Sequence, residues 1–213
     1  VINVWPREVK FGQGVSSIKV VYSHYLITRE ALAFVDRHHD RPFFLYWSLT
    51  IPHAKNEARA KGMEVPDYGI YRDRAWPEPQ KGHAAMITRM DSDVGRLLAR
   101  LEHHGIADNT VGFFTSDNGP HREGGNDPDF QDSNGPLRGM KRDLFECGIR
   151  VPFIARWPGR IRAGSTSRQT ICFTDLLATF AAVVDVQLPR DAGPDSFNIL
   201  PVLLGEQPED KPI

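Results

Sequence analysis

Three short stretches of the 213-residue sequence carry side chains that could do chemistry. Asp117 and Asn118 are neighbours, and a carboxylate beside an amide carbonyl suits a hard cation such as Ca²⁺ or Mg²⁺. His53 follows a Thr-Ile-Pro sequence, and imidazole is the commonest general acid or base near neutral pH. Lys141 lies among further cationic residues, and such a cluster could clamp an anion. Two oxygens are too few for a metal, so further ligands must come from elsewhere.

Each stretch also has a plain structural interpretation. Asp-Asn-Gly is a common turn sequence, because it adopts left-handed conformations at little cost. A single His at a strand end is more often structural or solvated than catalytic, and the cations of residues 136–143 could form a solvated charged face. Four residues of the loop after Asn118 are weaker candidates for contacts to a ligand: His121, Arg122, Asp132 and Asn134.

Helical and strand patterns alternate along the chain. Apolar side chains at helical spacing predict helices over residues 28–38, about 82–104 and from 174 onward. Continuous aromatic and aliphatic runs predict buried strands over residues 43–49, 110–116 and 151–157. Alternation of this kind predicts an α/β domain with a largely parallel sheet flanked by helices.

End signals and one apolar face define the helices further. Thr28 is the expected N-cap of the first helix, and Gly105 is the expected C-cap of the second. Asp93 is expected to lie off the apolar face of the second helix. That face is formed by Met86, Met90, Val94, Leu97, Leu98 and Leu101.

Two long loops, residues 50–81 and 116–150, each follow a predicted strand. Loops beyond about 12–15 residues are uncommon in compact domains and usually carry function or are disordered. Ligands of open α/β sheets bind beyond the carboxyl ends of the strands. The chemistry of the chain is therefore expected in these two loops, beyond the ends of the strands.

Composition limits the class of partner. The sequence has 26 Lys and Arg against 27 Asp and Glu, and this balance argues against nucleic acid as the main partner. The longest nearly apolar stretch, residues 176–186, is too short to span a bilayer, so no membrane partner is expected. Cys147 and Cys172 form neither a disulfide scaffold nor a metal-binding spacing, so cysteine usage does not indicate the compartment.

An ordered series of motifs resembles one known family. Its members lie at residues 41–46 (Arg-Pro-Phe-Phe-Leu-Tyr), 52–54 (Pro-His-Ala), 82–91, 115–120 (Thr-Ser-Asp-Asn-Gly-Pro), 139–141 (Gly-Met-Lys), 148–152 and 157–159 (Trp-Pro-Gly). In this order they resemble the type I, formylglycine-dependent sulfatases of the alkaline-phosphatase-like superfamily, and among these the bacterial arylsulfatases. The resemblance extends from about residue 22 to residue 204.

The resemblance implies a fold, an activity and a role for each candidate. It implies an alkaline-phosphatase-like α/β fold and hydrolysis of a sulfate monoester from a carbohydrate or aryl sulfate. Asp117 and Asn118 match two ligands of a catalytic Ca²⁺, with Mg²⁺ as the alternative. His53 matches the histidine that contacts the sulfate and protonates the leaving oxygen, and Lys141 matches the lysine that neutralises sulfate charge. The resemblance further implies that these four residues converge at one rim, where they grip a divalent cation and a tetrahedral oxyanion. It also implies a periplasmic or extracellular location.

Other elements of the family pattern are absent from the sequence. It contains no Cys-x-Pro-Ser-Arg motif, the source of the formylglycine nucleophile, and no amino-terminal Asp pair for the metal. We therefore expect residues 1–213 to be the C-terminal part of a sulfatase catalytic domain, an incomplete domain that is inactive alone. Residues from about 187 to 213 would lead toward a further subdomain. The alternatives are a phosphoester hydrolase of the same superfamily and a truncated, non-catalytic remnant.

Overall fold

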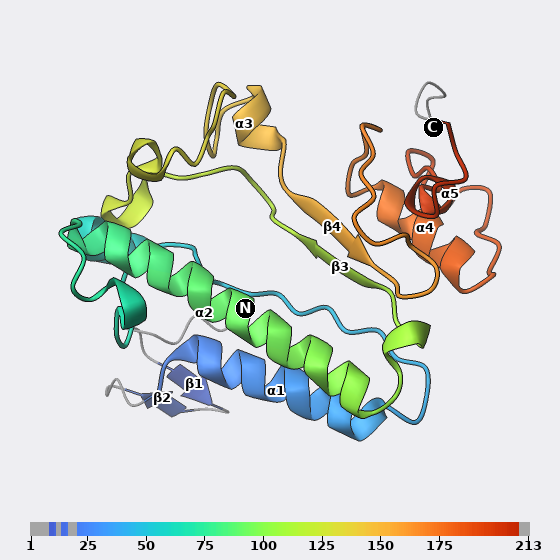
Figure 1. Cartoon of the computed structure of the whole chain (residues 1–213), viewed down its shortest axis with the longest axis horizontal. Coiled ribbons are helices and arrows are strands. Elements are labelled where there is room, and N and C mark those ends of the chain that lie inside the picture. Colours follow the sequence, from blue (N-terminus) through green and yellow to red (C-terminus); the bar gives the residue numbers. More distant parts are fainter. Residues whose placement is uncertain (1–8, 12–13, 17–20, 209–213) are drawn as a thin grey trace. The chain divides into compact units, whose positions relative to one another are not determined.

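A computed structural model describes residues 9–11, 14–16 and 21–208 of the chain. The chain divides into two compact units, one of Val1–Ile106 with Thr115–Pro152 and the other of Ala107–Phe114 with Phe153–Ile213. Figure 1 shows helices and short strands alternating along the chain, as the α/β prediction requires. All four expected site residues fall in the first unit.

The first unit is built on two long helices that lie side by side, α1 (Ser23–His38) and α2 (Glu78–His103) (Figure 1). The expected N-cap of α1 is wrong: the helix begins at Ser23, and Thr28 is buried within it. Helix α2 also begins earlier than expected, with a proline in its first turn, where the missing N–H costs no hydrogen bond. Gly105 follows its end with φ 67°, in keeping with the expected C-cap.

A buried polar cluster joins the two helices. Asp93 of α2 is only 5% exposed, although the apolar spacing placed it off the buried face. Its Oδ2 lies 2.8 Å from His24 Nε2 and accepts a hydrogen bond from the Thr28 hydroxyl at 3.1 Å. Arg96 donates to Oδ1 at 2.7 Å. The carboxylate is buried because α1 supplies the donors that water would otherwise provide.

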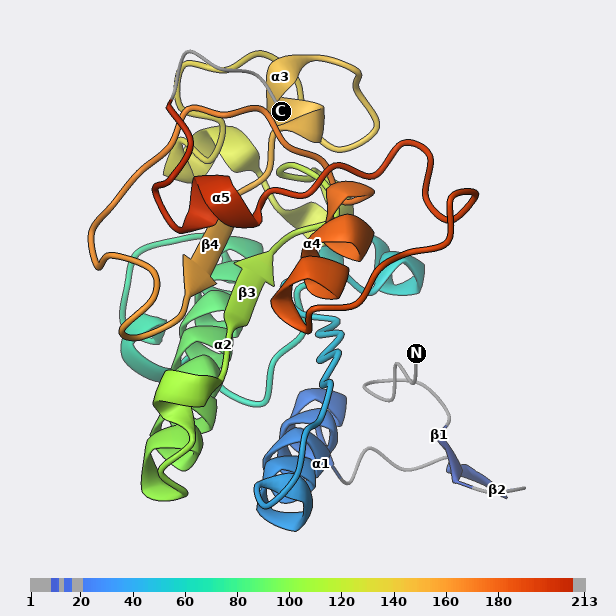
Figure 2. The ribbon, with the colours of Figure 1, turned by 90° about the vertical axis from the view of Figure 1, so that its right-hand side faces the viewer.

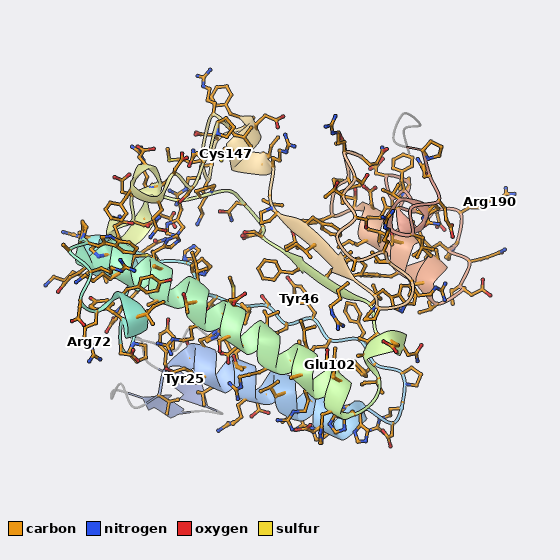
Figure 3. The ribbon with its side chains drawn as sticks, in the orientation of Figure 1. Tyr25, Tyr46, Arg72, Glu102, Cys147 and Arg190 are labelled. Carbon is orange, nitrogen blue, oxygen red and sulfur yellow. The ribbon has the colours of Figure 1, made fainter. Side chains whose placement is uncertain are left out.

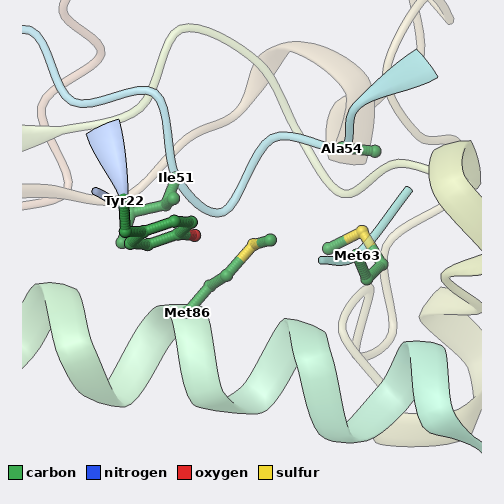
Figure 4. Close-up of a cluster of buried hydrophobic side chains, with 5 residues drawn as sticks. All are labelled: Tyr22, Ile51, Ala54, Met63 and Met86. Atoms are coloured by element: carbon green, nitrogen blue, oxygen red, sulfur yellow. The ribbon is translucent and has the colours of Figure 1, made fainter. Parts of the chain in front are cut away.

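A small hydrophobic core fixes the start of the first long loop on α2. It consists of Tyr22, Ile51, Ala54, Met63 and Met86, drawn in Figure 4. Met86 comes from α2, whereas Ile51 and Ala54 lie on either side of His53. Burial of these apolar groups therefore anchors the backbone that carries His53.

Residues 43–49 form no strand, so the prediction of a strand buried on both faces is wrong. The segment is extended, but its side chains alternate between half-buried and exposed. Phe44 is 69% exposed, and Tyr46, labelled in Figure 3, is 81% exposed. A strand buried on both faces needs a paired strand at its edge and a packed layer on each face, and among the described residues no strand pairs with this segment.

The described strand pairs are antiparallel rather than parallel. Strand β1 (Val9–Phe11) pairs antiparallel with β2 (Gly14–Ser16), with Val9 opposite Ser16 and Phe11 opposite Gly14. Strand β3 (Gly112–Thr115) pairs with β4 (Phe153–Arg156), and Figure 2 shows their arrows pointing in opposite directions. The α/β class is thus confirmed, but within the described residues each sheet has two strands and no pair is parallel.

The second unit continues from β4 into two helices, α4 (Asp175–Val183) and α5 (Leu200–Leu203). Helix α4 confirms the helix predicted from residue 174 onward, and α5 lies in the segment expected to lead toward a further subdomain. Phe113 of β3 packs against Phe153 of β4 and Phe180 of α4. Within the described ranges, no helix combines the length and the hydropathy needed to cross a membrane.

Candidate functional site

Close backbone packing brings the two long loops together in the first unit. Gly62 N–H donates to Gly124 O at 3.1 Å, so the first loop runs against the second. A Cβ built on Gly124, whose φ is 66°, would lie 2.5 Å from the Ala54 Cβ. Only glycine allows this approach without strain. The contact holds Glu123 in the second loop beside His53 in the first.

A second set of backbone hydrogen bonds carries Lys141 to the same place. Lys141 N–H donates to Pro120 O at 2.7 Å, and Gly119 N–H donates to Gly148 O at 3.1 Å, within helix α3 (Glu146–Ile149). A Cβ on Gly119 would lie 1.7 Å from Cys147 O, so this crossing also needs glycine. The stretch that follows β3 therefore lies directly against the stretch that carries the cationic cluster.

The His53 and Lys141 side chains, which lie far apart in the sequence, are in direct contact. Lys141 Nζ is 2.9 Å from His53 Nε2, and His53 Nδ1 is 2.7 Å from Ala54 O. Since an ammonium group has only donors, Lys141 donates and Nε2 accepts. The ring proton of His53 is then on Nδ1 and is donated to the Ala54 carbonyl. The His53 side chain is 44% exposed, so a ligand can reach this pair from solvent.

A partly buried carboxylate, Glu123, lies next to the pair. Its Oε2 is 2.9 Å from Lys141 Nζ and 3.5 Å from His53 Nε2, and its Oε1 forms an ion pair with Arg142. Burial alone would raise the pKa of Glu123, but the hydrogen bond and charge of Lys141, aided by Arg142, outweigh burial and lower that pKa. Glu123 is therefore ionised at neutral pH.

Sequence reasoning missed Glu123. An isolated Glu in a polar loop carries no distinguishing pattern. The one available signal is the Gly-Gly pair at residues 124–125, because paired glycines mark places where the backbone approaches another segment closely.

Two further histidines lie behind His53. The His121 ring centroid is 6.0 Å from that of His53, and the His83 centroid, from α2, is 5.8 Å from that of His121. His121 Nδ1 accepts from the Glu123 N–H at 3.1 Å, so its Nε2 donates to Pro52 O. Burial lowers the pKa of His83 to about 4 and also lowers that of His121. Both rings are neutral near pH 7.

Asp117 and Asn118 follow β3 directly, at the predicted strand end. The exposed Asp117 carboxylate has no hydrogen-bond or ion-pair partner in the part of the chain that the structure describes. The loop places the pair just before Pro120, whose carbonyl binds Lys141 N–H. Neither side chain, however, forms a hydrogen bond to His53 or Lys141. Of the four expected residues, His53 and Lys141 are therefore in direct side-chain contact. Asp117 and Asn118 are linked to them only by the backbone hydrogen bond between Lys141 and Pro120.

Two hard oxygen ligands suit Ca²⁺ in kind but not in number, since Ca²⁺ takes about 6–8 oxygens. Over residues 9–11, 14–16 and 21–208, no cluster of three or more His, Cys, Asp or Glu residues could hold a metal ion. Asp117 and Asn118 therefore fit as part of a ligand set and not as a whole one.

The four weaker ligand-contact candidates divide into two groups. Asn134 donates to Gly139 O of its own loop, and His121 forms hydrogen bonds at both ring nitrogens, one of them to Pro52 O of the first loop. Arg122 and Asp132 are exposed, although Arg122 is paired with Asp129. Only the exposed two could meet a ligand without rearrangement of the loop.

Comparison with known proteins gives one consistent result. A family model described as "Sulfatase" matches residues 12–186. The N-acetylgalactosamine-6-sulfatase of Mus musculus is 37% identical over 195 residues, which cover 88% of this chain and 34% of that protein. An N-acetylgalactosamine-6-O-sulfatase of Bacteroides thetaiotaomicron is 33% identical over 189 residues, covering 85% and 34%. Both mammalian and bacterial relatives match, so the comparisons do not confirm a particular similarity to the bacterial arylsulfatases.

Among solved structures, the crystal structure of Ps i-CgsB in complex with k-i-k-neocarrahexaose is similar with a TM-score of 0.74. It is 28% identical, and the match covers 96% of this chain and 43% of that one. The chain spans about a third of the length of the curated relatives that it matches.

Proposed function

Because this chain belongs to the sulfatase family, whose fold is the alkaline-phosphatase-like α/β fold, we propose that the protein hydrolyses sulfate monoesters and binds the sulfate group at His53 and Lys141. The observation that carries the proposal is the 2.9 Å contact between Lys141 Nζ and His53 Nε2 on a solvent-accessible rim. A sulfated glycan is the proposed substrate class. Relatives named as N-acetylgalactosamine-6-sulfatases and a structural neighbour holding neocarrahexaose support it.

Lys141 and His53 would act on different atoms of the ester. The Lys141 ammonium is a fixed positive charge for the sulfate oxygens, whose negative charge must be stabilised as the ester bond breaks. His53 Nε2 would face the leaving oxygen, with the ring held in place by the hydrogen bond from Nδ1 to Ala54 O. Protonation of the leaving oxygen requires a proton, taken from solvent, on Nε2, so the incoming ester would replace Lys141 as the hydrogen-bond partner of Nε2, and Lys141 would keep its charge for the sulfate oxygens.

Asp117 and Asn118 would contribute two oxygen ligands to a Ca²⁺ ion. Such an ion would supply positive charge against the sulfate oxygens, and in the family pattern a formylglycine would supply the nucleophile. The unpartnered Asp117 carboxylate at the end of β3 supports this role, because a metal would satisfy it. We thus assign roles in sulfate ester hydrolysis to two pairs of residues: Asp117 with Asn118, and His53 with Lys141.

A titration with methyl sulfate, followed through the ¹⁵N signals of His53 and Lys141, tests the proposal. Methyl sulfate should shift the His53 Nε2 signal of the unaltered chain, and Lys141→Ala should weaken binding about tenfold because a charge-assisted hydrogen bond is lost. Lys81→Ala is the matched control, since Lys81 lies in the first turn of α2 and its Nζ donates to the Arg72 carbonyl, outside the site. Equal affinities in Lys141→Ala and the control would contradict the proposal.

A further inference from the structure

The ionised groups beside the proposed sulfate position do not all have the same sign. Lys141 and Arg142 are positive, and both pair with the negative Glu123. His53, which accepts a hydrogen bond from Lys141, adds no charge in this arrangement. The cluster therefore presents a net charge of about one positive unit to an incoming anion.

We propose that Glu123 sets the charge class of the ester that this site accepts, favouring singly charged sulfate monoesters over doubly charged phosphate monoesters. The inference rests on the proposed function, because it concerns the same anion site. A sulfate monoester carries one negative charge, whereas a phosphate monoester approaches two above its second pKa of about 6. With Glu123 ionised, the net charge of the cluster balances the single negative charge of a sulfate monoester. Without that carboxylate, the two cations would balance the two negative charges of a phosphate monoester.

The field of Glu123 should reach the ligand. Its side chain is only 11% exposed, so solvent and salt screen its charge less than that of a surface carboxylate. One extra unit of ligand charge at about 6 Å from a carboxylate changes affinity about tenfold at an effective dielectric constant between those of protein surface and water. The lowered pKa of Glu123 keeps this charge present at and above neutral pH.

A purely structural role for Glu123 makes a different prediction. Methyl sulfate and methyl phosphate have nearly the same shape, and both would lose affinity equally if Glu123 only held Lys141 and Arg142 in position. The ratio of the two affinities therefore separates the charge effect from a structural one.

The test measures affinities for methyl sulfate and methyl phosphate at pH 8, by titration of the His53 and Lys141 NMR signals. Relative to the unaltered chain, Glu123→Gln should move the affinity ratio about tenfold toward methyl phosphate. Glu123→Asp, which keeps the charge, should stay within about twofold of the original ratio. An unchanged ratio in a folded Glu123→Gln variant overturns the proposal.

Two further variants keep the test decisive. If Glu123→Gln loses its near-ultraviolet circular dichroism, Arg142→Gln decides instead, because that side chain is 72% exposed and its neutralisation should move the ratio about threefold toward methyl sulfate. An unmoved ratio there overturns the proposal. Glu146→Gln is the control, since Glu146 also pairs with an arginine, Arg150, but outside the site. If neither ester shifts the signals of the unaltered chain, the proposed anion site itself fails.

Discussion

Single residues in the site are held in defined protonation states by their neighbours. Ala54 O and Lys141 together fix which nitrogen of His53 carries its proton. Burial keeps His83 neutral far below its ordinary titration range, with a pKa of about 4. The chemistry of these side chains therefore depends on contacts that other segments of the chain make with them.

Burial of His83 predicts a loss of stability in acid. Its folded-state pKa of about 4 lies below the unfolded value of about 6.5, so the unfolded chain binds the proton more readily. The stabilisation is complete above pH 6.5 and is lost as the pH falls toward 4. Urea unfolding measures the free energy of unfolding at pH 7.5 and at pH 4.5. Between these pH values, His83→Gln should lose about 2 kcal/mol less of that free energy than the unaltered chain.

The exposed His103→Gln variant, on the same helix, is the control for this comparison. It should keep the pH dependence of the unaltered chain. If His83→Gln also keeps it, the ring is not held neutral by the fold.

The sequence alone makes some of these residues visible. His53 and Lys141 stand out because few residue types can move protons or bind anions, and each follows a recognisable motif. Glu123 and His83 do not stand out, because their roles come from contacts with residues distant in the sequence. No local pattern records such contacts.

At the scale of elements, the pairing of α1 with α2 depends on a polar group as well as an apolar face. Asp93 binds His24 and Thr28 of α1 while nearly fully buried. Hydrophobic spacing predicts α2 and its glycine C-cap but cannot reveal that a charged position faces inward, because the donors belong to another helix. Composition likewise suggests a buried strand over residues 43–49 but cannot supply the strands that would pair with it.

Removal of the Asp93 carboxylate should weaken the helix pair. Asp93→Ala leaves the His24 and Thr28 donors buried without their acceptor, and we expect a loss of about 3 kcal/mol in the free energy of unfolding. Asp91→Ala is the matched control, since Asp91 is exposed on the same helix and should cost under about 0.5 kcal/mol. Urea unfolding measures both, and similar losses would show that the cluster is not stabilising.

The glycine contact between the loops gives a second prediction at this scale. Gly124→Ala places a Cβ 2.5 Å from Ala54 and 3.0 Å from Gly62, so the loops must separate. We expect weaker methyl sulfate binding as well as a stability loss of about 2–3 kcal/mol. Gly135→Ala has a similarly positive φ but no atom within 4 Å of the added carbon.

The control variant separates backbone strain from steric clash. Gly135→Ala should cost about 1 kcal/mol and leave anion binding unchanged. If Gly124→Ala does the same, close approach of the loops does not position the site.

At the scale of the whole molecule, the chain holds part of the proposed reaction machinery. It spans about a third of the length of its curated relatives, and the sequence has no Cys-x-Pro-Ser-Arg motif to supply a formylglycine. The family and the α/β class follow from ordered motifs spread over most of the chain. The direction of strand pairing cannot be predicted from these motifs, because they mark strand ends and not the neighbours of each strand.

The 213-residue chain alone should bind sulfate esters without hydrolysing them. Lys141 and His53 can hold the anion, but the sequence has no Cys-x-Pro-Ser-Arg motif for a nucleophile, and Asp117 and Asn118 supply only two of the about 6–8 oxygens that Ca²⁺ takes. Incubation with p-nitrophenyl sulfate and Ca²⁺ should therefore release no nitrophenol above the rate in buffer. Turnover abolished by His53→Ala would show that the chain is catalytically sufficient.

A crystal structure of the chain grown with p-nitrophenyl sulfate tests the central claim most directly. We predict sulfate oxygens about 3 Å from Lys141 Nζ and from His53 Nε2, with the ester oxygen on the histidine side. An ester bound elsewhere, with the lysine and histidine still hydrogen-bonded only to each other and to Glu123, would contradict the account.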